Sequence, residues 1–286
     1  MKKFLITILA LASLSAGMHA QERLPEYLQA EKFTLDKSAP TELAITIDEE
    51  SVLDEDNSVT FDKFYPDQIT IKLDANCDIS GLESLQYQKV NAVSDYVVNG
   101  TWTAYDAEKG IVVDPSEKLV IFFRAEDRAG NVTIVNSTGI VVDDQMPIGE
   151  TNAPEIDILP AAPNTNGFHN GNVVVDLKVV DPKYAGGSAN EAGFYSGLNK
   201  ITYRIYTTDT DEVEEGVLLD LIEATEGAVY DGDNLVSTWS GKITIDSTKF
   251  NSNNVVVEVS ATDNAGNIRT SSTTAGDIQI DITAPQ

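Results

Sequence analysis

Alternating apolar and polar residues, in short runs separated by turn residues, form the dominant pattern of this chain. Every second residue of 119–125 is apolar, and so is every second residue of 255–261, while Arg124 and Glu258 are among the polar residues between them. Successive side chains of a strand point to opposite faces, so each run predicts a strand with one buried face. Helical periodicity is nearly absent after the apolar N-terminus, apart from a candidate turn at 24–30. The chain is therefore predicted to be all-β.

In the first half of the chain, this pattern predicts a series of short strands, and the second half repeats their order. The predicted strands lie near 41–47, 68–73, 82–90, 100–105, 110–113, 119–126 and 132–142. Short strands at near-regular spacing, in units of about 105 and about 135 residues, are typical of β-sandwiches of about seven strands.

Two sequence motifs occur twice, in the same order. Ser-Gly-Leu at 80–82 opens a stretch that closes with Asp-x-Ala-Gly-Asn at 127–131, and the same motifs stand at 196–198 and 263–267. Internal repetition indicates repeated structural units. We therefore predict two tandem modules instead of one catalytic domain. The pentapeptide lies between two predicted strands, and its Gly, Asp and Asn residues are those of a hairpin turn, so turn chemistry alone explains it.

A third recurring element marks the module boundaries. Asp36, Asp143 and Asp281 each end a predicted strand and are followed four residues later by proline. Proline has no N–H and a fixed φ, so it ends a strand and stiffens the connection. The third pair, close to Gln286, suggests a chain that has been shortened or that continues in further repeats. The predicted organisation is a leader at 1–20, a lead segment at 21–40, and modules at 41–147 and 148–286.

The two tryptophans suggest where the second module is longer. Trp102 and Trp239 lie at nearly the same distance before the glycine of their pentapeptide, so we align them with each other. This alignment places the extra length within 207–235, where an acidic run predicts an elongated hairpin or loop. A large aromatic side chain dominates the burial in a small domain, so both tryptophans are expected in the sandwiches. If exposed, either could stack on a sugar ring.

The first twenty residues predict export. Lys2 and Lys3 precede the apolar run from Phe4 to Leu14, and small residues lead to Ala20, as in a cleaved secretory signal. Later stretches are too polar to cross a membrane, so no transmembrane segment is expected in the mature chain. The predicted location is secreted, in the extracellular space, at the cell surface or in the periplasm. Cys77 is the only cysteine, which excludes an intrachain disulfide.

The charge of the chain excludes one class of partner. Asp and Glu number 46 against 19 Lys and Arg, a formal net charge of −27. Nucleic acid binding needs a basic surface that displaces counterions, so no nucleic acid partner is expected. Two explanations of the acidic surplus stay open, and they can coexist. It provides a solvated surface that keeps an exported protein dispersed, or it gathers carboxylates for divalent cations.

Candidate catalytic residues are scarce. His19 belongs to the leader, which leaves His169 in a turn-like, exposed stretch as the only histidine. One histidine makes no zinc pair, and a nucleophilic serine would need a context that this sequence lacks. Cys77 has no identifiable base beside it. We therefore predict that the chain is not an enzyme, although a carboxylate pair for glycoside hydrolysis cannot be read from so acidic a sequence.

The repeated motifs resemble those of the bacterial immunoglobulin-like repeats of surface and adhesin proteins. The resemblance rests on Ser-Gly-Leu before a Tyr strand, an isolated Trp, Ala-x-Asp-x-Ala-Gly-Asn at 261–267 and Asp-x-Thr-Ala-Pro at 281–285. Residues 143–147 depart from this closing form. The resemblance implies two tandem immunoglobulin-like β-sandwiches that act as a stalk or adhesion segment, with a host or cell-surface protein or glycan as partner. The alternatives are a carbohydrate-binding or accessory module of an exported glycan-processing system, and an enzyme with an unread carboxylate site.

In an immunoglobulin-like sandwich, two loops and the incoming linker lie at the same pole. The acidic residues of those segments are therefore expected to converge, and hard oxygen ligands of this kind suit calcium. The predicted calcium ligands of the second module are Asp143, Asp144, Asp181, Asp263 and Asn267, and those of the first are Asp36, Asp74, Asp78, Asp127 and Asn131. No other cofactor is expected.

Overall fold

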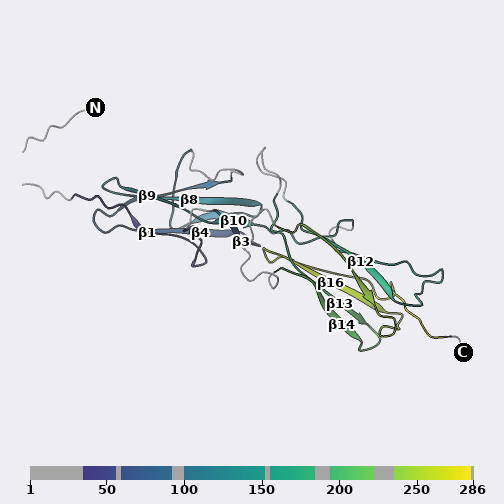
Figure 1. The fold of residues 1–286 in the computed structure, drawn as a ribbon. Helices are drawn as coiled ribbons and strands as arrows, with labels where there is room; N and C mark the ends of the chain where they lie inside the picture. Colours follow the sequence, from purple (N-terminus) through teal and green to yellow (C-terminus); the bar gives the residue numbers. More distant parts are fainter. Residues whose placement is uncertain are drawn as a thin grey trace, which may run out of the picture. The chain divides into compact units, whose positions relative to one another are not determined.

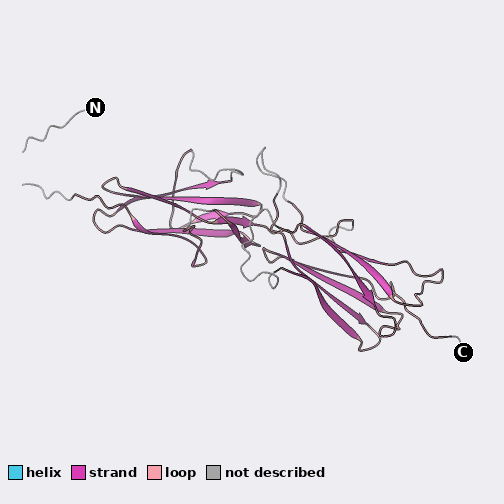
Figure 2. Cartoon of the chain, in the orientation of Figure 1, coloured by secondary structure: helices cyan, strands magenta, loops and turns pink. Residues whose placement is uncertain are grey.

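The structure is a computed structural model, and it describes the chain from residue 35 to residue 284 with five internal gaps. The described residues are 35–55, 59–91, 100–151, 155–183, 194–221 and 235–284. The predicted leader at 1–20 and the candidate turn at 24–30 lie outside them. All regular structure in the described part is strand (Figure 2). It contains no helix long and apolar enough to cross a membrane.

The first sandwich consists of two sheets. One sheet has the strand order β2-β1-β4-β7, and the other has the order β3-β10-β8-β5-β6, with β9 also paired to β8. In Figure 1, β8 and β9 are drawn above β1 and β4. The strands are β1 (Thr41–Ile47), β2 (Glu50–Ser51), β3 (Phe61–Tyr65), β4 (Ile69–Asn76), β5 (Leu82–Val90), β6 (Thr103–Ala104), β7 (Ile111–Val113), β8 (Glu117–Asp127), β9 (Val132–Asn136) and β10 (Gly139–Val142).

Strand β8 is the centre of the first sandwich because both of its faces are buried. Leu119 and Phe123 point into the space between the sheets and have no exposed surface, as the alternating pattern predicts. Val120 and Phe122 point to the other face, where they pack against Phe61 of β3 in a second cluster. Strand β3 was not among the predicted strands. It extends the sheet by pairing in parallel with β10, and its Phe61 side chain packs on this face.

The single strand predicted over 132–142 is wrong, because two strands occupy this stretch. Strand β9 pairs with β8 as far as Asn136, whereas β10 pairs with the beginning of β8 and with β3. The break lies at Ser137, which is fully buried and whose hydroxyl accepts a hydrogen bond from the backbone N–H of Ile121. The side chain thus replaces a ladder bond where the strand is interrupted. Gly139 then lies so close to the ring of Phe61 that a Cβ there would stand 2.4 Å from it.

The second sandwich is formed by a three-stranded sheet and a four-stranded sheet, and all its strand pairs are antiparallel. The sheets have the orders β11-β12-β15 and β14-β13-β16-β17. Two antiparallel sheets of three and four strands form the architecture of immunoglobulin-like sandwiches. The chain therefore contains two tandem immunoglobulin-like β-sandwiches. The strands are β11 (Asp157–Pro160), β12 (Val173–Val180), β13 (Leu198–Thr207), β14 (Val213–Asp220), β15 (Thr238–Ile245), β16 (Val255–Asp263) and β17 (Ile268–Ser272).

The tryptophans do not occupy equivalent positions, which corrects the alignment made from the sequence. Trp102 comes just before β6, which pairs with β5, whereas Trp239 lies in β15, which pairs with β12. Strand β15 therefore corresponds to β7, and β14 corresponds to β6. Both tryptophans are partly buried against hydrophobic clusters, and the ring of Trp239 lies over Gly241. Within 207–235, β14 pairs with β13 as a hairpin, and residues 222–234 lie outside the described part.

The largest side chain in the core of the first sandwich provides a test of its packing. Phe123→Ala removes a ring with no exposed surface and leaves a cavity, so the free energy of unfolding of this sandwich is expected to fall by about 3–5 kcal/mol. The matched control is Ile134→Ala on β9, where the side chain is 47% exposed and the expected change is within about 0.5 kcal/mol. Urea titrations followed by circular dichroism measure both. Equal effects of the two substitutions would contradict the assigned core.

Candidate metal centre

The linker before each sandwich carries an aspartate that binds the backbone in the same way. Asp143 follows β10, and its Oδ1 accepts a hydrogen bond of 3.0 Å from the N–H of Gln145. Its Oδ2 accepts one of 2.8 Å from the N–H of Ser196, in the Ser-Gly-Leu before β13. Asp36 makes the equivalent bonds, 2.9 Å from the N–H of Ser38 and 3.0 Å from the N–H of Ser80. The linker aspartate therefore fixes the incoming chain to the Ser-Gly-Leu loop in both copies.

The Asp-x-Ala-Gly-Asn pentapeptide forms a hairpin turn and also reaches the linker. In the second sandwich, Asp263 accepts hydrogen bonds of 2.9 Å from both the backbone N–H and the side-chain amide of Asn267. The same amide donates to the carbonyl of Asp143 at 2.6 Å. Gly266 closes the turn with a φ of 94°. The turn predicted from the sequence is confirmed, and its asparagine joins the turn to the linker.

The first sandwich repeats this second contact. Asp127 accepts hydrogen bonds of 2.8 Å from the N–H and from the side-chain amide of Asn131, and that amide donates to the carbonyl of Asp36 at 3.3 Å. We call this set of contacts the junction frame: the linker aspartate, the turn aspartate, the turn asparagine and the Ser-Gly-Leu loop. The first junction frame contains Asp36, Asp127, Asn131 and Ser80, and the second contains Asp143, Asp263, Asn267 and Ser196.

The residue that follows β4 or β12 completes each junction frame and differs between them. Asp181 comes after β12 and is only 1% exposed. Its Oδ2 accepts from the N–H of Gly197, whereas its Oδ1 is buried without any hydrogen-bond partner. Cys77 comes after β4, and its Sγ lies 3.8 Å from the hydroxyl of Ser80. Only the second junction frame therefore contains an unpartnered buried oxygen at this position.

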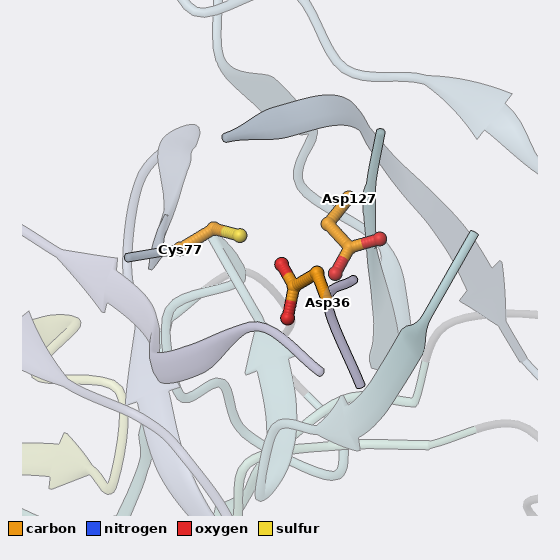
Figure 3. Close-up of side chains that lie close together, drawn as sticks. All are labelled: Asp36, Cys77 and Asp127. Atoms are coloured by element: carbon orange, nitrogen blue, oxygen red, sulfur yellow. The ribbon is translucent and has the colours of Figure 1, made fainter. Parts of the chain in front are cut away.

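The acidic side chains of each frame lie close enough together to share a cation. In the second frame, one oxygen each of Asp143, Asp181 and Asp263 lies within 4.8 Å of the others, and all three residues are buried. In the first frame, the ligand atoms within 4.8 Å of one another are one carboxylate oxygen each of Asp36 and Asp127 and the Sγ of Cys77. Figure 3 shows the thiol of Cys77 and the carboxylate of Asp127 on either side of Asp36.

Electrostatics distinguish the two clusters. Burial raises the pKa of Asp181 to about 8, and the neighbouring carboxylate of Asp143 adds to the effect. Burial also raises the pKa of Asp263 to about 6, against the opposing hydrogen bonds from Asn267. In the described part of the chain, no Lys or Arg forms an ion pair with any of these three carboxylates. The second cluster is thus short of positive charge.

In the first cluster, hydrogen bonds stabilise the charges. Bonds from Ser38 and Ser80 lower the pKa of Asp36. Burial acts to raise the pKa of Asp127, but the bonds from Asn131 and Ala129 outweigh it, so that this pKa is lowered. Two carboxylates with this many donors are stable as anions without a further partner.

The donor set of the second cluster fits a hard divalent cation. Calcium takes six to eight oxygen ligands from carboxylates, carbonyls and water at about 2.3–2.6 Å. The three carboxylates supply such oxygens, and each oxygen that accepts one hydrogen bond keeps a second lone pair. Histidine and thiolate ligands, which zinc sites use, are not among these three residues.

The structure brings together only part of the predicted ligand set. Asp36, Asp127 and Asn131 meet, and so do Asp143, Asp181, Asp263 and Asn267. Asp74 does not join them, because β4 continues to Asn76 and its alternation turns Asp74 to the exposed face. Asp78 and Asp144 are exposed and lie outside both clusters.

Cys77 was missed as a member of the first cluster, although the pattern contained a signal for it. The inward positions of β4 are the odd-numbered residues from Ile69 to Ala75, and Cys77 is the next position of that series. Asp181 continues the inward series of β12 in the same way, after Val179. Cys77 and Asp181 are therefore equivalent when positions are counted along the buried face of β4 and β12. An alignment on the Ser-Gly-Leu motif does not show this.

His169 is less exposed than the sequence suggests. It is half-buried, its backbone N–H donates to the carbonyl of Gln279, and its carbonyl accepts from the N–H of Asp281. Burial lowers the pKa of its imidazole. These two backbone hydrogen bonds tie residues 279–281 to the loop that contains His169.

Comparison with known proteins finds similarity in structure only. No family model and no curated protein matches the chain. A bacterial ice-binding adhesin structure is 15% identical, with 87% of this chain and 67% of that chain covered and a TM-score of 0.33. The fibronectin(III)-like modules of CbhA from Clostridium thermocellum are 11% identical, with coverages of 83% and 93% and a TM-score of 0.30. A segment of two fibronectin type III domains from chicken tenascin is 8% identical, with coverages of 83% and 100% and a TM-score of 0.28.

Proposed function

We propose that this chain is a non-enzymatic extracellular stalk or adhesion segment of a bacterial surface or secreted protein. The observation that carries the proposal is the repeated junction frame. Each sandwich binds the linker that precedes it through the side chain of Asp36 or Asp143 and through the amide of Asn131 or Asn267. A frame that recurs at each module limits the freedom of the linker, which is what a spacer requires. A spacer of this kind would hold part of the protein away from the cell, where it could contact a host or cell-surface protein or glycan.

The carbohydrate-binding alternative has less support. A site that stacks on sugar rings needs an accessible aromatic face. Trp102 and Trp239 are both partly buried against hydrophobic clusters, and the ring of Trp239 covers Gly241. The role of both side chains in packing is therefore sufficient to explain their presence.

The second junction frame is proposed to bind calcium through Asp143, Asp181 and Asp263. Three buried carboxylates at close range repel one another, and an ionised carboxylate is costly to bury without a compensating charge. One oxygen of Asp181 has no hydrogen-bond donor, so a cation would satisfy a group that the protein leaves unpartnered. Because Asp143 belongs to the linker, a bound ion would also tie the linker to the loops of the second sandwich.

Small-angle X-ray scattering tests the spacer role. A single compact domain of about 266 residues has a radius of gyration of about 18 Å. For the chain without its predicted leader, we expect a clearly larger value in calcium and a Kratky plot without the plateau of a flexible chain. A radius close to that of one compact domain would contradict the stalk proposal.

Thermal melts test the calcium site. A dissociation constant of about 10⁻⁴–10⁻³ M is common in extracellular modules, and it predicts about 1–2 kcal/mol of stabilisation at about 5 mM calcium. This corresponds to a rise in Tm of about 3–8 °C relative to the protein in chelator. The double substitution Asp143→Asn with Asp263→Asn is expected to abolish the rise, whereas the exposed pair Asp78→Asn with Asp144→Asn keeps it. A rise that persists in the first double variant refutes this site.

The pH dependence of the calcium-free protein follows from the buried carboxylates. The pKa of Asp181 is about 8 in the folded chain, against about 3.9 for an unfolded aspartate, so the folded state holds an additional proton between these values. In chelator, stability is therefore expected to fall as the pH rises from about 4 to about 8. Melts at about pH 5, 6.5 and 8.5 measure the fall. Asp181→Asn should flatten the profile, and an equally steep profile in that variant would contradict the assignment.

A further inference from the structure

We infer that the residue after β4 or β12 decides whether a junction frame binds a divalent cation, so that Asp181 makes the second frame a calcium site and Cys77 makes the first a metal-independent joint. This inference rests on the proposed calcium site and assigns it to the second of two otherwise matching junction frames. It also names the single position that distinguishes them.

The positions of Cys77 and Asp181 are structurally equivalent. Cys77 and Asp181 each continue the buried face of their strand by one inward position. Each lies within 4.8 Å of the linker aspartate and of the turn aspartate of its own frame. The hydrogen bonds around them also correspond, because Ser80 and Ser196 donate their backbone N–H to the linker aspartate in both copies.

The difference between aspartate and cysteine at this position changes the charge and the hydrogen bonding of the frame. With Asp181, three buried carboxylates face one another and one of their oxygens has no donor. With Cys77, two carboxylates remain, and both accept backbone or amide hydrogen bonds on each of their oxygens. The second frame therefore needs a proton or a cation to offset its third carboxylate, whereas the first frame needs neither.

The two side chains also differ as metal ligands. A thiol sulfur is a soft ligand, whereas calcium binds oxygen. The first frame has thus lost one hard ligand at the position where the second has its unpartnered oxygen. With two carboxylates left, the first frame offers calcium too few protein ligands, while its hydrogen bonds still hold the linker.

Calorimetric titration of calcium into the chelator-treated chain, without its predicted leader and with a phosphine reductant present, tests the inference. We expect one calcium per wild-type chain, two per Cys77→Asp chain, none per Asp181→Cys chain, and one per Cys77→Ser chain as the matched control. Circular dichroism and the Tm of each variant in chelator establish that it is folded. Because the reciprocal variant tests the same position, the inference does not depend on the folding of Cys77→Asp alone.

The outcomes separate the inference from the calcium proposal. No binding by the wild-type chain would refute the calcium site, and the inference with it. One calcium per wild-type chain together with one per Cys77→Asp chain, or one per Asp181→Cys chain, would refute the inference and leave the calcium site standing. A zinc titration with binding that Cys77→Ser abolishes would show that the first frame is a metal site, and this also refutes the inference.

Discussion

The hydrogen bonds that a linker aspartate accepts from backbone N–H groups hold each junction together. Asp143 binds Gln145 in its own linker and Ser196 in the loop before β13, and Asn267 binds the carbonyl of Asp143 from the opposite hairpin. Hydrogen bonds with a charged acceptor are stronger than neutral ones. Releasing the linker would leave the buried N–H of Ser196 without a partner, which carries a cost in desolvation. The frame therefore restrains the linker through hydrogen bonds to its backbone and to the side chain of Asp143.

The same frame also brings carboxylates together, and their repulsion is greatest in the second junction. Bringing the linker aspartate to the Ser-Gly-Leu loop places it beside the turn aspartate, so two carboxylates are buried together in every copy. In the first copy, donors from Ser38, Asn131 and the Ser80 loop offset the repulsion. The second copy adds Asp181 and leaves one oxygen of it without a donor. The second frame therefore holds one more carboxylate than the first in an otherwise matching set of hydrogen bonds.

The fold and most of this frame could be predicted from the sequence, because both follow from short-range patterns. Alternation gave β1 and β5 their bounds, and Gly266 with the flanking Asp and Asn marked the hairpin turn. The break at Ser137 could not be predicted, since only the packing of β3 and β10 requires it. The tryptophan alignment failed because similar spacing does not identify equivalent strands. Cys77 belongs to the first cluster because it continues the inward, odd-numbered positions of β4. A prediction that considered only acidic residues as ligands could not include it.

In the junction frame, different residues set the path of the linker and the charge of the junction. The hydrogen bonds of the linker aspartate and the turn asparagine place the linker, and they are the same whether Asp181 or Cys77 completes the frame. The completing residue directly follows a core strand and belongs to neither hydrophobic cluster of the sandwiches. One side chain can therefore alter the charge of a junction while the path of the chain is kept. Repeats related by duplication could in this way differ in their dependence on cations without any change in fold.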